Sequence, residues 1–191
     1  MADAQKVVVV DTETTHYKPY LAKILECAAV VVEGSEIVQS FVTMSNPGKQ
    51  ALVGAEEALK VNGITIAEVE AAPPAETARQ VFRRWLAQVG HAPELTSFNL
   101  AYDIGVLVGN RWLSHSETLY RSGDCIMLQA QKVMGPAGKL RQWDDGSYKW
   151  PSLAEAKAFF GIDVKDVHRA LADATAAAKV MIAIQRSKVV T

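Results

Sequence analysis

Four adjacent valines, at positions 7–10, begin the regular hydrophobic pattern of this chain. An uninterrupted run of β-branched residues is typical of a strand buried on both faces, such as a central strand of a sheet. Later segments predict two longer strands that form a hairpin, and then two shorter strands. These four predicted strands span residues 24–32, 37–44, 95–98 and 123–126.

Apolar residues three or four positions apart predict an amphipathic helix over residues 76–89. Other helices are predicted at 56–61, at 100–113, in a short segment ending at residue 134, at 152–160 and at 169–185. A strand meander followed by alternating strands and helices predicts an α/β fold with a five-stranded mixed sheet flanked by helices. No internal boundary is evident, so we expect one domain over residues 1–191, with an elaborated loop or hairpin at about 135–150.

Composition narrows the function only slightly. The chain has 191 residues, 49% of them hydrophobic, and a formal net charge of −1, which excludes a globally basic nucleic-acid binder but allows a local basic patch. Cys27 and Cys125 form no CxxC pair, so neither a zinc site nor a disulfide framework is indicated. Because no signal peptide or membrane-spanning run is evident, we expect no membrane partner and a cytoplasmic location.

Two acids follow the valine run directly. Asp11 and Glu13 are two positions apart, so in a strand their side chains point to the same side and converge. Two like charges at the end of an apolar strand repel each other unless a cation lies between them, and a divalent cation with oxygen ligands fits best. The alternative is a strand that ends in a solvated acidic turn.

Two later segments place further acids at the start of helices. Asp103 lies in the first turn of the helix that follows the strand at 95–98, and Asp173 lies early in the last helix, five positions after His168. Each acid is also explained by the favourable helix dipole alone. If the acids hold a metal ion, however, a nearby imidazole is suited to take a proton from an attacking water.

These segments together resemble the three exonuclease motifs of the DEDDh group of 3′–5′ exonucleases, the family of the epsilon subunit and of ribonuclease T. Residues 11–15 match the first motif, 99–103 the second and 168–173 the third. The resemblance spans nearly the whole chain. It implies a ribonuclease-H-like fold and a metal-dependent 3′–5′ exonuclease that releases nucleoside 5′-monophosphates from single-stranded or frayed DNA ends.

The resemblance also assigns roles to the five motif residues. Asp11 would bridge two divalent cations, Mg²⁺ or Mn²⁺, and Glu13 and Asp173 would complete the first of these sites. Asp103 would act mostly through a water molecule, and His168 would be the general base. Independently of any family, two cations about 3.5–4 Å apart can stabilise both the attacking and the leaving oxygen of an in-line displacement.

Substrate contacts are expected around these motifs, where the sequence departs from the family pattern. His16 replaces a usual glycine, Asn62 replaces a usual histidine, and Tyr102 stands where relatives often have phenylalanine. These departures affect the grip on the substrate and leave the five motif residues intact. The candidate substrate-binding residues are Thr12, Thr14, Thr15, His16, Asn62, Asn99, Tyr102, Arg141 and Trp143.

Arg141 and Trp143 belong to a basic and aromatic segment at 139–150, in which Asp145-Gly146 predicts a hairpin turn. Such a segment suits single strands, because cations meet phosphates and aromatic rings stack on bases. The alternative, which we favour here, is a small hairpin whose Trp143 and Trp150 pack onto the domain.

Partners and rival functions complete the predictions. The expected partner is single-stranded DNA. RNA remains an alternative, because discrimination between the two depends on contacts with the 2′-hydroxyl. The resemblance also allows a homodimer, since family members of this size often form one. One rival class is a haloacid-dehalogenase-type phosphatase, but it needs Asp where Glu13 stands and has no use for His168 and Asp173. The other is a non-catalytic nucleic-acid-binding module, which the five intact motif residues disfavour.

Overall fold

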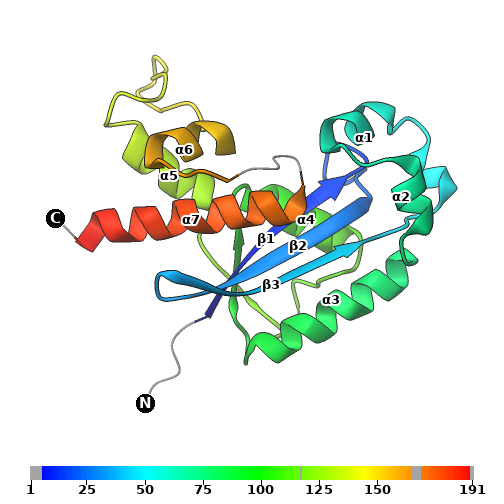
Figure 1. Cartoon of the computed structure of the whole chain (residues 1–191). Coiled ribbons are helices and arrows are strands. Elements are labelled where there is room, and N and C mark those ends of the chain that lie inside the picture. The colour runs from blue at the N-terminus through cyan, green and yellow to red at the C-terminus, as the bar shows by residue number, and fades with distance from the viewer. Residues whose placement is uncertain (1–5, 117, 165–168, 190–191) are drawn as a thin grey trace.

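The structure, a computed structural model, describes residues 6–116, 118–164 and 169–189. Its strands within these residues are β1 (Lys6–Thr14), β2 (Ile24–Glu33), β3 (Glu36–Met44), β4 (Glu94–Ser97) and β5 (Arg121–Ser122). They form a five-stranded sheet in the order β3-β2-β1-β4-β5 (Figure 1). β1 pairs antiparallel with β2 and parallel with β4, so the predicted mixed sheet with β1 at its centre is confirmed.

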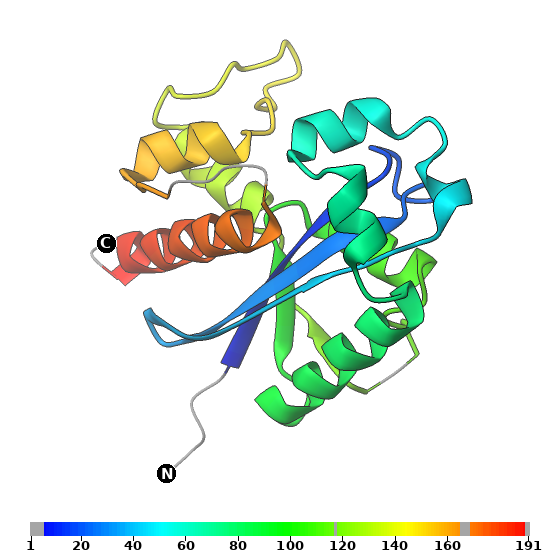
Figure 2. The ribbon, with the colours of Figure 1, turned by 45° about the vertical axis from the view of Figure 1, so that its right-hand side comes forward.

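Helices cover both faces of this sheet. The described helices are α1 (Glu56–Asn62), α2 (Ile66–Ala71), α3 (Ala75–Val89), α4 (Leu100–Gly109), α5 (Ile126–Met134), α6 (Leu153–Phe160) and α7 (Ala170–Val189), with a 3-10 turn at Lys49–Leu52. Helices α3 and α4 pack on one face, and α5, α6 and α7 on the other. Figures 1 and 2 show α1 and α2 near the end of the sheet where β1 ends.

The valine run is buried because each of its faces meets a different hydrophobic core. Val8 and Val10 belong to the core beneath α3 and α4, whereas Val9 belongs to the core beneath α5 and α7. All three are fully buried. Since side chains alternate along a strand, Thr12 continues the α4 side of β1, while Asp11 and Glu13 continue the α7 side. This alternation decides which helix each polar residue meets.

The predicted fifth strand at 123–126 is wrong. Strand β5 comprises Arg121–Ser122, and α5 begins at Ile126. Residues 123–125 connect the two elements, and Ile126 begins the helix, where Ile126, Ala130 and Met134 recur at helical spacing and are buried in the α7-side core. The strand thus ends before the predicted segment, which four residues of mixed polarity do not reveal.

Helix α4 ends earlier than predicted, at Gly109 instead of residue 113. Asn110 is its C-cap, and Arg111 adopts a positive φ of 61° that reverses the chain. This reversal turns Trp112 and Leu113 back into the core beneath α3, where both are buried. Helix α2 was not predicted from the sequence; it begins at Ile66, directly after its N-cap Thr65.

The segment at 135–150 contains an antiparallel bridge between Gln142 and Tyr148, as expected for a small hairpin. Its tryptophans do not pack as we favoured, because Trp143 is 43% and Trp150 64% exposed. Instead, the Arg141 guanidinium lies 4.4 Å from the centre of the Trp143 ring. No helix in the described part of the chain is long and apolar enough to cross a membrane.

Candidate active site

Three carboxylates from two elements converge where β1 ends beside α7. Oxygen atoms of Asp11, Glu13 and Asp173 all lie within 4.8 Å of one another. Asp11 and Glu13 project from the α7 side of β1, and Asp173 lies in the first turn of α7. Carboxylate oxygens are the ligands that Mg²⁺ and Mn²⁺ prefer, so this donor set fits a hard divalent cation.

Asp103 approaches the same place from the opposite face of β1. It is 4% exposed in the first turn of α4, and its Oδ1 accepts a 2.9 Å hydrogen bond from the Thr12 hydroxyl. The alternation of β1 therefore explains both halves of the site. Thr12 orients Asp103 on one side of the strand, while Asp11 and Glu13 face Asp173 on the other.

The clustering of acids strongly disfavours their charged forms. Burial, together with repulsion from Asp103, Glu13, Asp173 and Glu26, raises the pKa of Asp11 well above its usual value. Burial and the neighbouring acids raise the pKa of Glu13 to about 7, and burial raises the pKa of Asp103 to about 6. A bound cation would relieve this repulsion, which is the physical reason to expect one here.

The raised pKa of Glu13 predicts an unusual pH dependence of stability without metal. The folded protein holds this proton more tightly than the unfolded chain, whose carboxyl titrates near 4.5. The contribution is therefore present below pH 4.5 and is lost as the pH rises through about 7. We expect the Tm in EDTA to fall between pH 5 and pH 8, and Mg²⁺ at pH 8 to raise it again. Asp11 and Asp103 contribute to the same fall, so Glu13→Gln should reduce it in part, and an equal fall in that variant would contradict the assignment to Glu13.

Beside the carboxylates lies an open cavity of about 610 Å³. Several predicted substrate-binding residues line it: Thr12, Thr14, Thr15, His16, Asn62 and Tyr102. Tyr17 and Glu57, which the sequence reading did not select, line it too. Arg141, Trp143 and Asn99 are not among its lining residues, although Asn99 is the N-cap of α4.

Many polar groups of the cavity wall are held by internal hydrogen bonds. The Tyr102 hydroxyl lies 2.6 Å from Thr14 Oγ1 and donates to the His16 carbonyl oxygen at 2.8 Å. Asn62 donates from Nδ2 to the Thr14 carbonyl oxygen at 3.0 Å, and Thr15 Oγ1 accepts from the Lys23 N–H. These bonds fix the end of β1 and the start of the loop that follows it, so the cavity is preformed before a ligand binds.

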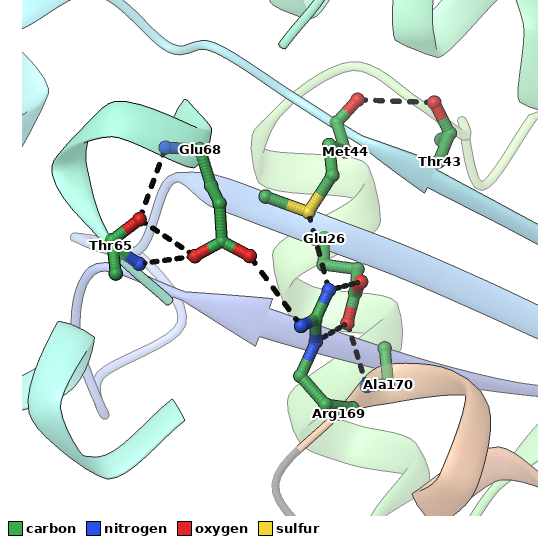
Figure 3. A network of polar contacts seen from close by, with 7 residues as sticks. All are labelled: Glu26, Thr43, Met44, Thr65, Glu68, Arg169 and Ala170. Carbon is green, nitrogen blue, oxygen red and sulfur yellow. Dashed lines mark hydrogen bonds and ion pairs between the residues drawn. The ribbon is translucent and has the colours of Figure 1, made fainter. Parts of the chain in front are cut away.

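A charged network that the sequence reading missed holds α7 beside the site (Figure 3). Glu26 on β2 is 3% exposed and accepts two hydrogen bonds from the Arg169 guanidinium, at 2.7 and 3.2 Å. The same carboxylate accepts the backbone N–H of Ala170 at 2.9 Å, so it also caps the first turn of α7. Arg169 lies 3.7 Å from Glu68 of α2 as well.

This network fixes the helix turn that carries Asp173. Glu26 lies directly opposite Glu13 in the β1–β2 register, yet it turns to an arginine and a helix terminus. An acid among the apolar residues of a buried strand was the available signal, because such a charge needs a partner. His168, the predicted base, lies outside the described residues.

An α/β sheet of this order, with acids gathered at the end of its central strand, defines a ribonuclease-H-like nuclease domain. Comparison with known proteins agrees: the family model for the RNase_T exonucleases matches residues 8–181. The chain belongs to this exonuclease family, and the predicted resemblance to the DEDDh group is confirmed. This protein is therefore an exonuclease, a hydrolase that acts on nucleic-acid ends.

Two curated relatives are polymerase proteins. The chain is 29% identical over 180 residues to the DNA polymerase III subunit epsilon of Aquifex aeolicus (strain VF5), covering 93% of this chain and 79% of that one. It is 24% identical over 187 residues to the PolC-type DNA polymerase III of Bacillus subtilis (strain 168), covering 95% of this chain. It spans only 12% of that second relative.

Solved structures support the fold. E. coli exonuclease I, in complex with a dT13 oligonucleotide, matches with a TM-score of 0.75 at 17% identity, covering 97% of this chain and 42% of that one. Exonuclease I from Methylocaldum szegediense matches with a TM-score of 0.71 at 16% identity, covering 95% and 40%. The chain thus spans less than half the length of these structures.

Proposed function

We propose that this chain hydrolyses phosphodiester bonds at the 3′ end of single-stranded or frayed DNA and releases nucleoside 5′-monophosphates. The observation that carries the proposal is the convergence of the Asp11, Glu13 and Asp173 carboxylates within 4.8 Å at the rim of an open cavity. Membership of an exonuclease family, and a related fold solved with a dT13 oligonucleotide, support DNA as the substrate.

The chemistry follows from the positions of the acids. Asp11, Glu13 and Asp173 would hold divalent cations, Mg²⁺ or Mn²⁺, with Asp103 contributing from the α4 side. When two such ions are bound, they offset the charge on the attacking and leaving oxygens of the scissile phosphate. Asp103 is kept in a fixed orientation by Thr12, so it holds its place as the substrate enters.

The general base of this reaction would be His168. Its role rests on its place five residues before Asp173 in the third motif. The Glu26–Arg169 network fixes Arg169, the residue that follows His168 in the sequence. An imidazole titrates near neutral pH and is suited to take the proton of the attacking water.

The terminal nucleoside would occupy the cavity beside the carboxylates. Among the residues that line it, His16 and Tyr102 carry rings suited to stack on a base, and Thr14 holds the Tyr102 hydroxyl in place. Thr12, Thr15 and Asn62 act as supports, since their side chains hold Asp103, the Lys23 backbone and the end of β1. Arg141 and Trp143 would reach only a longer strand, because they do not line this cavity.

A gel assay tests the proposal directly. Short 5′-labelled strands of DNA and RNA are incubated with Mg²⁺ or Mn²⁺, beside an EDTA control and the variant His168→Ala. We expect a metal-dependent ladder that shortens from the 3′ end, slowed by about 10²–10⁴-fold in the variant. The matched control, His115→Ala, removes an exposed histidine outside the motifs and should leave the ladder unchanged. Intact DNA and RNA strands with both metals would refute the proposed activity.

A further inference from the structure

A cavity larger than that of the candidate active site lies away from the carboxylates and is lined by arginines. It measures about 820 Å³ and runs between α3 and the C-terminal end of α4. No acid is among the described residues that line it. Four arginines do line it: Arg79, Arg83, Arg84 and Arg111. We refer to these four residues and the cavity between them as the arginine groove.

Two of these arginines are held in place by the backbone. Arg79 donates from Nη1 to the Arg111 carbonyl oxygen at 3.2 Å, and Arg83 donates from Nη1 to the Trp112 carbonyl oxygen at 3.0 Å. The reversal of the chain at Arg111 supplies both acceptors, because it brings these carbonyls toward α3. Arg84 and Arg111 are exposed. Arg79 is also ion-paired with Glu76 on the same helix. The groove therefore combines two oriented guanidinium groups, one of them paired with an acid, with the two exposed groups of Arg84 and Arg111.

The candidate active site lacks such cations. Its cavity is lined by Glu13 and Glu57, and no lysine or arginine is among the described residues that line it. A nucleic-acid strand carries one charge per phosphate, so an acidic cavity in a chain of net charge −1 attracts it poorly. Attraction for the strand beyond its last nucleotide has to come from another part of the surface.

The loop between β1 and β2 connects the two places. Pro19 of this loop packs against α4, with its Cβ about 3.3 Å from the position that a Cβ on Gly105 would occupy. Asn110, at the end of α4, donates from Nδ2 to the Ala22 carbonyl oxygen at 2.9 Å. Along this path Tyr17 is 76% and Tyr20 74% exposed. Exposed aromatic rings between a reaction site and a basic groove suit the stacking of bases.

We propose that the arginine groove binds the phosphodiester backbone of the substrate strand on the 5′ side of the scissile end. This inference rests on the proposed function and extends it to strand length. Asp103 and Gly109, the last residue of α4, are six residues apart, a helical rise of about 9 Å, and Arg111 lies beyond that end of the helix. A stacked strand covers about 3.4 Å per nucleotide, so the groove is reached by strands of about four nucleotides or more.

The test removes the two exposed charges and compares strand lengths. Arg84→Gln/Arg111→Gln is compared with Lys132→Gln/Arg186→Gln, which removes two exposed charges from the opposite, α7-side face of the sheet. Binding of a labelled dT12 strand is measured in EDTA over a range of salt concentrations. For the groove variant we expect the Kd at low salt to rise about tenfold, and the slope of log K against log salt to shrink by about 1.4. The control should match the wild type.

Hydrolysis separates this site from the catalytic one. For the groove variant we expect a higher KM for dT12 with unchanged kcat, and an unchanged rate on a dinucleotide, which is too short to reach the groove. Unchanged binding and KM for dT12 would overturn the proposal and leave the groove to an acidic protein segment; failure of the wild type to bind dT12 at low salt would overturn it too. If the wild type binds dT12 through the groove but degrades no strand, the proposed function fails and the groove assignment stands.

Discussion

Asp11→Asn should lower the rate of strand hydrolysis at least a thousandfold and, in EDTA at pH 8, raise the Tm. The substitution removes one carboxylate of the cluster, and with it the means to hold a catalytic cation, whose electrostatic effect amounts to several kcal/mol. About 4 kcal/mol corresponds to roughly a thousandfold in rate. The Tm rises because the charge at this position is desolvated and repelled by neighbouring acids, which raise its pKa.

Measuring both quantities on one preparation makes this prediction specific. The rate is taken from the release of mononucleotides with Mg²⁺, and the Tm from thermal unfolding without metal. Asp163→Asn, a matched change at an exposed acid, should alter neither quantity. Activity within tenfold of the wild type would remove Asp11 from the catalytic set. A lowered Tm would show that the carboxylate stabilises the metal-free fold.

Arg169→Gln should destabilise the protein by about 3 kcal/mol and lower kcat as well. The change leaves the Glu26 carboxylate buried without the guanidinium that donates two hydrogen bonds to it. Removing one partner of a buried ion pair typically destabilises a protein by about 3–5 kcal/mol. We take the lower end because the Arg169 side chain is 40% exposed. The first turn of α7 loses its support, so Asp173 shifts relative to Asp11 and Glu13. Urea unfolding and steady-state kinetics measure the two effects.

A second substitution distinguishes the network from arginine packing alone. Glu26→Gln in the Arg169→Gln background removes the stranded charge while keeping an acceptor for the Ala170 N–H. The double variant should therefore be more stable than Arg169→Gln. Lys149→Gln breaks an exposed pair with Glu155 and should change the free energy of unfolding by less than about 1 kcal/mol. If the double variant is no more stable than Arg169→Gln, the unpaired Glu26 charge is not the cause of the destabilisation.

The sequence was most informative where one local rule decides the outcome. Alternation along a strand is enough to place Asp11 and Glu13 on one side, and the structure adds that Asp173 meets them there. The valine run likewise predicts a strand buried on two faces, and each face has its own core. The predicted helix at 152–160 is α6, and its capping box, with Ser152 as N-cap and Glu155 three positions on, is likewise a local pattern of residue types.

Prediction failed where the outcome depended on residues far apart in sequence. Glu26 and Arg169 are 143 positions apart, and only folding brings them into contact. The arginine groove depends on the left-handed turn at Arg111, which periodicity does not reveal. The segment at 123–126 runs from β5 to the start of α5, and the burial of Ile126 in the α7-side core marks where the helix begins.

The pairing of Glu26 with Arg169 has a consequence for the net charge of the site. It removes one acid from the local sum, so Asp11, Glu13, Asp103 and Asp173 together contribute four negative charges when ionised. Two divalent cations would bring that sum to zero, whereas one would leave an excess of two negative charges facing an anionic phosphate. The scissile phosphodiester would then enter a neutral site. Without the metals the four carboxylates would repel it, even while the arginine groove holds the rest of the strand, so entry of the reacting phosphate would depend on metal binding.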